Sequence, residues 1–411
     1  MSDVRAYMSV TTAYWGLTVT DGALRMLVLL YFHTLGYTPL QLAYLFLLYE
    51  AMGIATNLFG GWIGAKFGLR FTLHAGLSIQ VVAMLMLSAL DTKWGTVNSV
   101  IYVMVAQALS GIAKDLTKMS SKSAIKVIIT DADTAGASKL FKWVALLTGS
   151  KNALKGAGFF VGGALLTNIG FQFALWAMAI ALSLILVAAL FSVRTELGKA
   201  AGDVKISALF QSGPAVNMLA FARIFLFAAR DVWFVVGVPI FLYEQLNWSF
   251  DQVGLFMACW VIGYGFVQSF VPAVIRSAQD AQSATRSAQI WGWIMATVPA
   301  VLAAALIKSH SLPLSAAVVL IGGLVIFGFV FAINSALHSY LIVALADPER
   351  ASVAVGFYYM ANAMGRFAGT LLSGLIYQYG GLTACLWASA IFIAIAAFSA
   401  RFVKPPKLVE A

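Results

Sequence analysis

Charged side chains stand inside stretches of the sequence that are otherwise apolar. An ionisable residue within a membrane-spanning segment is costly, and it is therefore a candidate functional residue. Seven of these residues are basic and four are acidic, so we expect them to line a cavity that favours an anion. The basic set is Arg25, Lys114, Lys151, Lys155, Arg223, Arg230 and Arg366, and the acidic set is Asp21, Glu50, Asp115 and Asp231.

The spacing of these charges predicts which of them share a helix face. Asp21 and Arg25 are four residues apart, as are Lys151 and Lys155, and residues at this spacing are neighbours on a helix. At about 1.5 Å of rise per residue, Lys151 lies roughly 18 Å into a helix that starts at Lys139, near the middle of a bilayer. Two cations at that depth, with no acid nearby in the sequence, favour an anion site.

A guanidinium grips a phosphate or carboxylate with two N–H groups, whereas a lysine acts as a point charge. We therefore predict that a doubly charged head group is held by basic residues from both halves of the chain. The predicted substrate-binding residues are Arg25, Lys151, Lys155, Arg223, Arg230 and Lys114. The predicted charge partners or proton carriers are Asp21, Glu50, Asp231 and Asp115. Structural ion pairs remain an alternative for Asp21 with Arg25, Lys114 with Asp115, and Arg230 with Asp231.

We find no pattern of catalytic or metal-binding residues in the sequence. Cys259 and Cys385 are the only cysteines, too few for a zinc or iron–sulfur site, and we find no nucleophile–base set or phosphate-binding loop. We therefore expect no enzyme, no metal and no cofactor. His338, with Asn334 nearby, is expected to be a hydrogen-bonded histidine at a helix end, with a proton-coupling role as the alternative.

The composition defines the class of protein. Hydrophobic residues make up 61% of the chain and charged residues 10%, whereas a soluble domain is about half apolar and about a quarter charged. This excludes soluble and disordered proteins and leaves an all-α polytopic membrane protein. The net charge of +10 belongs to cytoplasmic loops, because Lys and Arg concentrate there, and it does not indicate a nucleic-acid partner.

Twelve stretches are long enough to span a bilayer, and the basic residues between them place both termini in the cytoplasm of a multi-pass inner (plasma) membrane protein. The predicted spans lie near residues 9–32, 39–65, 71–90, 97–119, 140–168, 171–193, 215–243, 250–275, 287–307, 312–338, 351–378 and 381–403.

A repeat with an offset of about 210 residues relates the two halves. Asp21 aligns with Asp231, and Gly170 aligns with Gly380. Two related halves of six helices are a transporter architecture. We therefore predict an N-terminal half over residues 1–193, a cytoplasmic linker over 194–214 and a C-terminal half over 215–411. The glycines of residues 156–163 are expected to form helix contacts.

One loop motif supports this architecture. Residues 61–70, GWIGAKFGLR, resemble the G-x-x-x-D-R-x-G-R-R signature of the major facilitator superfamily. Gly61, Lys66, Gly68 and Arg70 occupy gating positions of that signature. Ala65 stands where the family usually has Asp, which puts the charge relay of that Asp in doubt. The resemblance implies the major facilitator fold, with twelve helices in two halves of six.

Four longer strings resemble the organoarsenical efflux permease family ArsJ. They are residues 20–27 (TDGALRML), 108–126, 143–156 and 228–236 (AARDVWFVV). The resemblance implies export of 1-arseno-3-phosphoglycerate, an ester made by glyceraldehyde-3-phosphate dehydrogenase from arsenate, and hence arsenate resistance. It implies a monomer in the lipid bilayer, functionally linked to that dehydrogenase. The alternatives are an organophosphate/phosphate exchanger or another anion carrier, and a membrane sensor that binds the anion without moving it.

Overall fold

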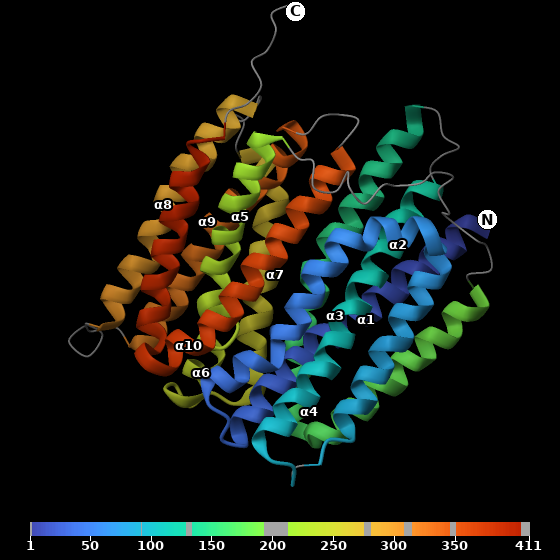
Figure 1. Cartoon of the computed structure of the whole chain (residues 1–411), viewed down its shortest axis with the longest axis horizontal. Helices are drawn as coiled ribbons and strands as arrows, with labels where there is room; N and C mark the ends of the chain where they lie inside the picture. Colours follow the sequence, from blue (N-terminus) through green and yellow to red (C-terminus); the bar gives the residue numbers. More distant parts are fainter. Residues whose placement is uncertain are drawn as a thin grey trace, which may run out of the picture. The chain divides into compact units, whose positions relative to one another are not determined.

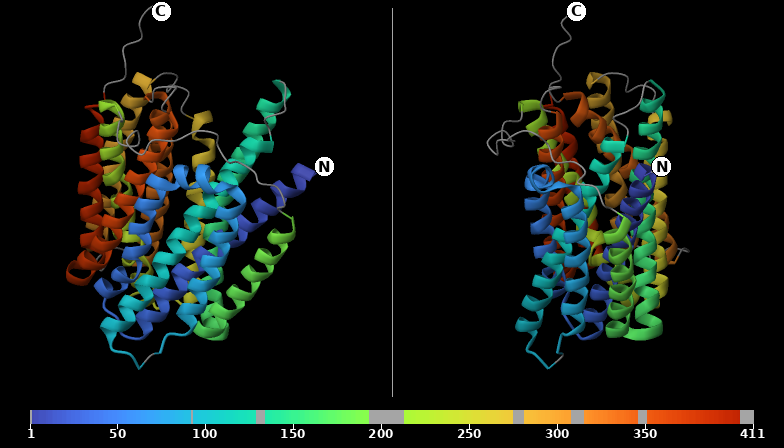
Figure 2. Two further views of the ribbon diagram at one scale, coloured as in Figure 1. Left: turned by 45° about the vertical axis from the view of Figure 1, so that its right-hand side comes forward. Right: turned by 90° about the vertical axis from the view of Figure 1, so that its right-hand side faces the viewer.

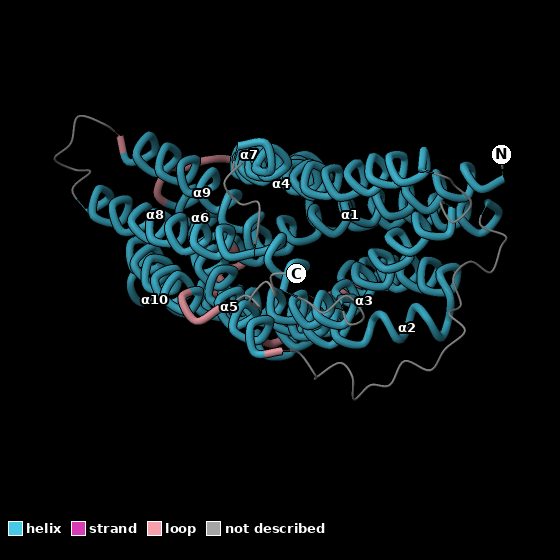
Figure 3. The backbone as a smooth tube through the Cα atoms, turned by 90° about the horizontal axis from the view of Figure 1, so that it is seen from above, coloured by secondary structure: helices cyan, strands magenta, loops and turns pink. Residues whose placement is uncertain are grey.

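The computed structural model describes residues 2–91, 93–128, 134–192, 213–274, 281–307, 315–345 and 351–403. All regular structure in these ranges is helical (Figures 1 and 3). The helices are α1 (Ser2–Thr34), α2 (Pro39–Ser88), α3 (Thr96–Ile128), α4 (Thr134–Ser192), α5 (Pro214–Phe234), α6 (Gly237–Glu244), α7 (Phe250–Val274), α8 (Ala281–Ile307), α9 (Ala316–Leu345) and α10 (Ala351–Ala400). The prediction of an all-α protein is thus confirmed.

Three of the longest helices break at a glycine. Gly68 in α2, Gly170 in α4 and Gly381 in α10 have φ values of 77°, 74° and 63°. Residues with a Cβ rarely adopt this conformation, so glycine permits the chain to reverse there. Figure 2 shows α4 turning back on itself. With each of these helices counted as two segments, and α5 with α6 as one, the described helices match the twelve predicted spans.

The breaks also refine the predicted repeat. Gly170 and Gly381 end the first segments of α4 and α10 and are separated by 211 residues. The sequence alignment paired Gly170 with Gly380, one residue too early. The turn is therefore common to the two halves, and only the register of the alignment was wrong.

The helices have the lengths and compositions of membrane spans. Nine helical stretches in the described ranges are long and apolar enough to cross a bilayer. Two of them, Ser150–Ser192 and Gly356–Ala400, contain a glycine break and are long enough for two spans each. The chain is a multi-pass membrane protein. α1, which carries Asp21 and Arg25, is not among the nine.

The described chain forms two compact units. Unit 1 comprises residues 1–37, 44–204 and 248–262, and unit 2 comprises residues 38–43, 205–247 and 263–411. Unit 1 thus includes the beginning of α7, and unit 2 includes the beginning of α2. The predicted halves, residues 1–193 and 215–411, remain a prediction.

In unit 1, glycines let α4 pack closely against two neighbours. A Cβ on Gly158 or Gly162 would collide with the backbone of α1. A Cβ on Gly156 or Gly163 would collide with the backbone of α7. Small residues allow helices in a membrane to approach until their backbones touch. The expected helix-contact role of these glycines is confirmed.

In unit 2, α10 packs along α5 and α8, and α8 packs on α9. Trp233 on α5 and Phe327 on α9 make an edge-to-face contact in the core, with ring centroids 5.0 Å apart. Ser373 of α10 stabilises the break between α5 and α6. Its Oγ accepts hydrogen bonds from the backbone N–H groups of Val236 (3.1 Å) and Gly237 (3.3 Å). These two donors would otherwise lack partners at the start of a helix.

Candidate anion-binding centres

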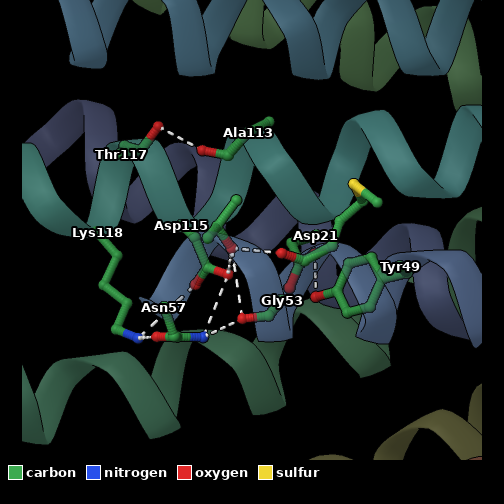
Figure 4. Close-up of polar contacts among 10 residues, drawn as sticks. Asp21, Tyr49, Gly53, Asn57, Ala113, Asp115, Thr117 and Lys118 are labelled. Atoms are coloured by element: carbon green, nitrogen blue, oxygen red, sulfur yellow. Dashed lines mark hydrogen bonds and ion pairs between the residues drawn. The ribbon is translucent and has the colours of Figure 1, made fainter. Parts of the chain in front are cut away.

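Tyr49 of α2 is the central residue of the polar centre in unit 1. Its hydroxyl donates a hydrogen bond of 2.7 Å to Oδ1 of Asp21 on α1 (Figure 4). Its ring lies 4.0 Å from Nζ of Lys114 on α3 and 5.7 Å from the guanidinium carbon of Arg25. One side chain therefore touches groups from three positions that the sequence singled out, by two different kinds of interaction.

Arg25 pairs with Glu50 and not with Asp21. Its Nη2 lies 3.3 Å from Oε1 of Glu50, and the Glu50 side chain is fully buried. The Phe46 ring lies 5.3 Å from the guanidinium carbon of Arg25. Helical spacing allowed Asp21 and Arg25 to pair with each other, but the structure joins each of them to α2 instead.

Asp115 belongs to a second network, between α2 and α3. Its Oδ2 accepts hydrogen bonds from Thr56 Oγ1 (2.6 Å) and Asn57 Nδ2 (3.5 Å), and its Oδ1 lies 3.7 Å from Nζ of Lys118. Lys118 also donates a 2.9 Å hydrogen bond to Oδ1 of Asn57 (Figure 4). Asp115 is thus satisfied by these neighbours, and the possible structural pair with Lys114 is not formed.

Lys114 differs from Arg25 and Lys118, which each have a carboxylate as an ion-pair partner. Its Nζ is buried and has no hydrogen-bond partner within the described part of the chain. The Lys114 Nζ lies against the π face of the Tyr49 ring. A buried ammonium with three N–H donors is costly unless acceptors surround it, so this burial favours anion binding by Lys114, which remains a prediction.

The two lysines of α4 have different surroundings. Lys151 is exposed, and Lys155 is half-buried with its Nζ 5.8 Å from the centroid of the Phe159 ring. The Lys155 backbone carbonyl lies against Gly22 of α1. Both lysines make further interactions. Their role in anion binding remains a prediction.

Arg230 of α5 forms the polar centre of unit 2. Its Nε donates a 2.6 Å hydrogen bond to Oδ1 of Asp231, its neighbour in sequence. The rings of Phe227, Phe331 and Phe234 lie 4.9, 5.5 and 5.7 Å from its guanidinium carbon. Within the described residues this is the only hydrogen bond of Arg230, so its terminal nitrogens remain available. Arg366 is close enough to add to the positive potential.

Arg223 lies on the same face of α5 as Arg230, but it has different partners. Its Nε donates to Oδ1 of Asn362 (2.7 Å) and its Nη1 donates to the backbone carbonyl of Ser335 (3.1 Å). Arg223 is 3% exposed, and its partners lie on α10 and α9. Its role in substrate binding remains a prediction.

Comparison with known proteins identifies the fold of the chain that carries these two centres. The sequence profile of the Major Facilitator Superfamily matches residues 219–411. The D-xylose–proton symporter is 12% identical, with a TM-score of 0.70 over 98% of both chains. The chain has the major facilitator fold. No curated protein sequence matches it.

Two further solved structures have the same fold over nearly the whole length. The nucleoside transporter NupG is 13% identical, with a TM-score of 0.70 over 98% of this chain and 100% of that one. A bacterial homologue of the iron transporter ferroportin, in an inward-facing state, is 14% identical, with a TM-score of 0.66 over 97% and 98%. At these identities the similarity establishes the major facilitator fold and leaves the cargo open.

The loop motif of the major facilitator fold is present with a changed chemistry. Gly68 provides the reversal between two segments of α2, as its place in the motif predicts. Arg70 is half-buried at the start of the second segment, while the side chain of Lys66 lies outside the described part. The gating role of Gly61, Lys66, Gly68 and Arg70 remains a prediction.

Sequence reasoning missed the aromatic residues of both centres. Tyr49 directly precedes Glu50, and Phe227 lies four residues after Arg223 and three before Arg230. These spacings put Phe227 on the same face as both arginines, so the signal existed. Its ring does contact both guanidinium groups, at 4.4 and 4.9 Å. The described residues contain no group of three His, Cys, Asp or Glu able to hold a metal ion.

Proposed function

We propose that the protein is a secondary transporter that exports an organic anion by alternating access across the inner membrane, with both termini in the cytoplasm. The proposed cargo is 1-arseno-3-phosphoglycerate, supplied by glyceraldehyde-3-phosphate dehydrogenase, and the proposed physiological result is arsenate resistance. The major facilitator fold supports transport as the activity. The resemblance of residues 20–27 and 228–236 to arsenic-export permeases supports the cargo. We expect a monomer to be the working unit.

The buried Nζ of Lys114 is the observation that carries the proposal. Desolvation penalises an ammonium that lacks acceptors, and a π face replaces only part of the lost hydration. An oxygen of a phosphate or arsenate group would supply the missing acceptor. Arg25, whose guanidinium carbon lies 5.7 Å from the centroid of the same Tyr49 ring, is the second cation of this centre and has Glu50 as its counter-ion.

Arg230 offers the complementary chemistry in unit 2. Asp231 holds Nε and fixes the plane of the guanidinium, so the two terminal nitrogens present a preorganised pair of donors. Two parallel N–H groups match the geometry of two oxygens on phosphate or arsenate. Unit 2 therefore has a candidate oxyanion centre of its own.

The cysteines support a pentavalent cargo. Trivalent arsenic is held by several thiolates, whereas Cys259 is exposed on α7 and Cys385 is buried on α10, where its Sγ lies 3.9 Å from the carbonyl oxygen of Ser373. These two residues do not form a thiolate cluster. Lysine and arginine are the side chains that recognise the oxygen-rich esters of pentavalent arsenic and phosphorus.

The experiment uses everted membrane vesicles, whose cytoplasmic face points outward. Arsenate is supplied with or without the dehydrogenase, glyceraldehyde 3-phosphate and NAD, and the arsenic inside the vesicles is counted. Accumulation only with the complete mixture is the expected result. Accumulation with arsenate alone would indicate an oxyanion carrier, and a requirement for phosphate inside the vesicles would indicate an organophosphate exchanger.

A matched pair of variants connects the flux to the structure. Lys114→Gln removes the buried ammonium, and Lys93→Gln removes an exposed lysine outside the helices. We expect Lys114→Gln to lose accumulation and Lys93→Gln to keep it, at equal amounts of protein in the membrane. Binding of the ester without any accumulation in the wild type would favour the sensor.

A further inference from the structure

A second cluster in unit 2 forms around a buried cation, Arg223, whose ring neighbour Phe227 is shared with Arg230 of the Arg230–Asp231 pair. Arg223 is 3% exposed, and no carboxylate of the described residues lies within ion-pair distance of it. The rings of Phe227 and Tyr358 lie 4.4 and 4.8 Å from its guanidinium carbon. Two of its five N–H donors are used, by Asn362 and Ser335.

His338 of α9 completes this cluster. It is 2% exposed, and its Nδ1 has no hydrogen-bond partner among the residues described. Ser335, whose carbonyl accepts from Arg223, is three residues earlier on the same helix face. Arg223 therefore reaches the turn of α9 that carries His338, because its Nη1 lies 3.1 Å from the Ser335 carbonyl oxygen. α9 extends to Leu345, so His338 lies inside the helix, and the expectation of a hydrogen-bonded helix-end histidine is wrong.

The cluster carries the positive charge of Arg223 without a counter-ion among the described residues, which favours the binding of an anion. An unpaired buried cation costs several kcal/mol, of which hydrogen bonds and aromatic faces recover a part. Arg230 has Asp231 as its counter-ion, whereas the neighbours of Arg223 are amide, hydroxyl, carbonyl and imidazole groups. Asn334 does not help, because its Nδ2 donates to the carbonyl of Ala288 on α8.

We propose that Arg223 and His338 bind a compact inorganic monoanion of the chloride type inside unit 2. A halide accepts hydrogen bonds from any direction, so it matches the unused N–H donors of Arg223 and a donor nitrogen of His338. Arg223, His338, Tyr358 and Asn362 are each less than 10% exposed. A single compact ion suits such enclosed surroundings. The bound ion neutralises Arg223 and stabilises the packing of α5, α9 and α10.

The test measures the thermal stability of the purified full chain against chloride concentration, with gluconate keeping the ionic strength constant. A ligand that binds only the folded state raises Tm with the logarithm of its concentration, and we expect a rise of about 3–5 °C for a hundredfold increase above Kd. Arg223→Gln and His338→Gln should flatten this dependence. Arg286→Gln, the matched control at an exposed position of α8, should keep it.

Two outcomes would overturn the proposal: a wild-type Tm that does not respond to chloride, or equal responses in wild type and Arg223→Gln. Should both cluster variants fail to fold, crystals of the wild type soaked in bromide decide the matter. An anomalous peak beside Arg223 and His338 supports the site, and the absence of a peak refutes it. None of these measurements uses the arsenical ester, so their result is independent of the proposed transport activity.

Discussion

The Nε of Arg230 donates a hydrogen bond of 2.6 Å to Oδ1 of Asp231, the next residue in the chain. Consecutive helical residues point about 100° apart, so the two side chains leave α5 in different directions. The long arginine side chain instead bends back to its neighbour. The carboxylate, 2% exposed, keeps the guanidinium in one plane and leaves the terminal nitrogens for a ligand.

Arg230→Lys tests the importance of two parallel donors. The charge remains, but a lysine presents a point charge and cannot grip two oxygens in one plane. Losing a charge-assisted hydrogen bond costs about 1.5–3 kcal/mol, so we expect the KM for export to rise about 10- to 100-fold. Arg286→Lys, at an exposed position of α8, is the control. Equal KM values for the two variants would contradict a role for the guanidinium fork.

Gly369→Ala tests how Asp231 is held in place. A Cβ on Gly369 would lie 2.7 Å from Cβ of Asp231 and 3.0 Å from the carbonyl oxygen of Ala228, so α10 or Asp231 must shift. We expect export to fall several-fold and the unfolding free energy to fall by about 1–3 kcal/mol. Flux and thermal melts on the same preparations provide the measurement.

The control for that variant is Gly263→Ala, because a Cβ on Gly263 meets no atom within 4 Å. It should leave both flux and Tm near the wild-type values. Wild-type transport by Gly369→Ala would show that the geometry of the Arg230–Asp231 pair is not required.

Tyr49 allows its two roles to be separated. Tyr49→Phe removes the hydrogen bond to Asp21 but keeps the ring beside Lys114, whereas Tyr49→Leu removes both. An unsatisfied buried carboxylate costs about 1–3 kcal/mol or more, so both variants should melt at lower temperature. Only Tyr49→Leu should also weaken export, because only it removes the aromatic face of the cation. Equal loss of export in the two variants would assign the function to the hydroxyl.

The fold followed from the sequence because its causes are local. Twenty apolar residues suffice to define a span, and a glycine within a hydrophobic stretch, such as Gly68 or Gly170, marks the reversal between two spans. The error of one residue at Gly381 shows the limit: a repeat detected from scattered identities fixes the offset only approximately.

The pairing of charges could not be read in the same way. Spacing places Asp21 and Arg25 on one face of α1, but it does not say that Tyr49 and Glu50 of α2 both lie opposite that face. Packing between helices decides which partner is nearer. The sequence therefore identified the ionisable residues of the centres, while their partners required the structure.

Arg25 and Glu50 provide the last test, because their ion pair can be broken and rebuilt. Glu50→Gln or Arg25→Gln leaves one buried charge without its partner, which costs about 3–5 kcal/mol in well-packed surroundings. We expect each single variant to melt at a clearly lower temperature than the wild type. The exchange variant, Arg25→Glu with Glu50→Arg, should recover much of the stability, because the pair contacts are internal to unit 1. Export should remain low in the exchange variant, since the guanidinium would start from α2 and no longer occupy its present place near the Tyr49 ring. Recovery of both stability and export would make the pair purely structural and exclude Arg25 from the oxyanion centre.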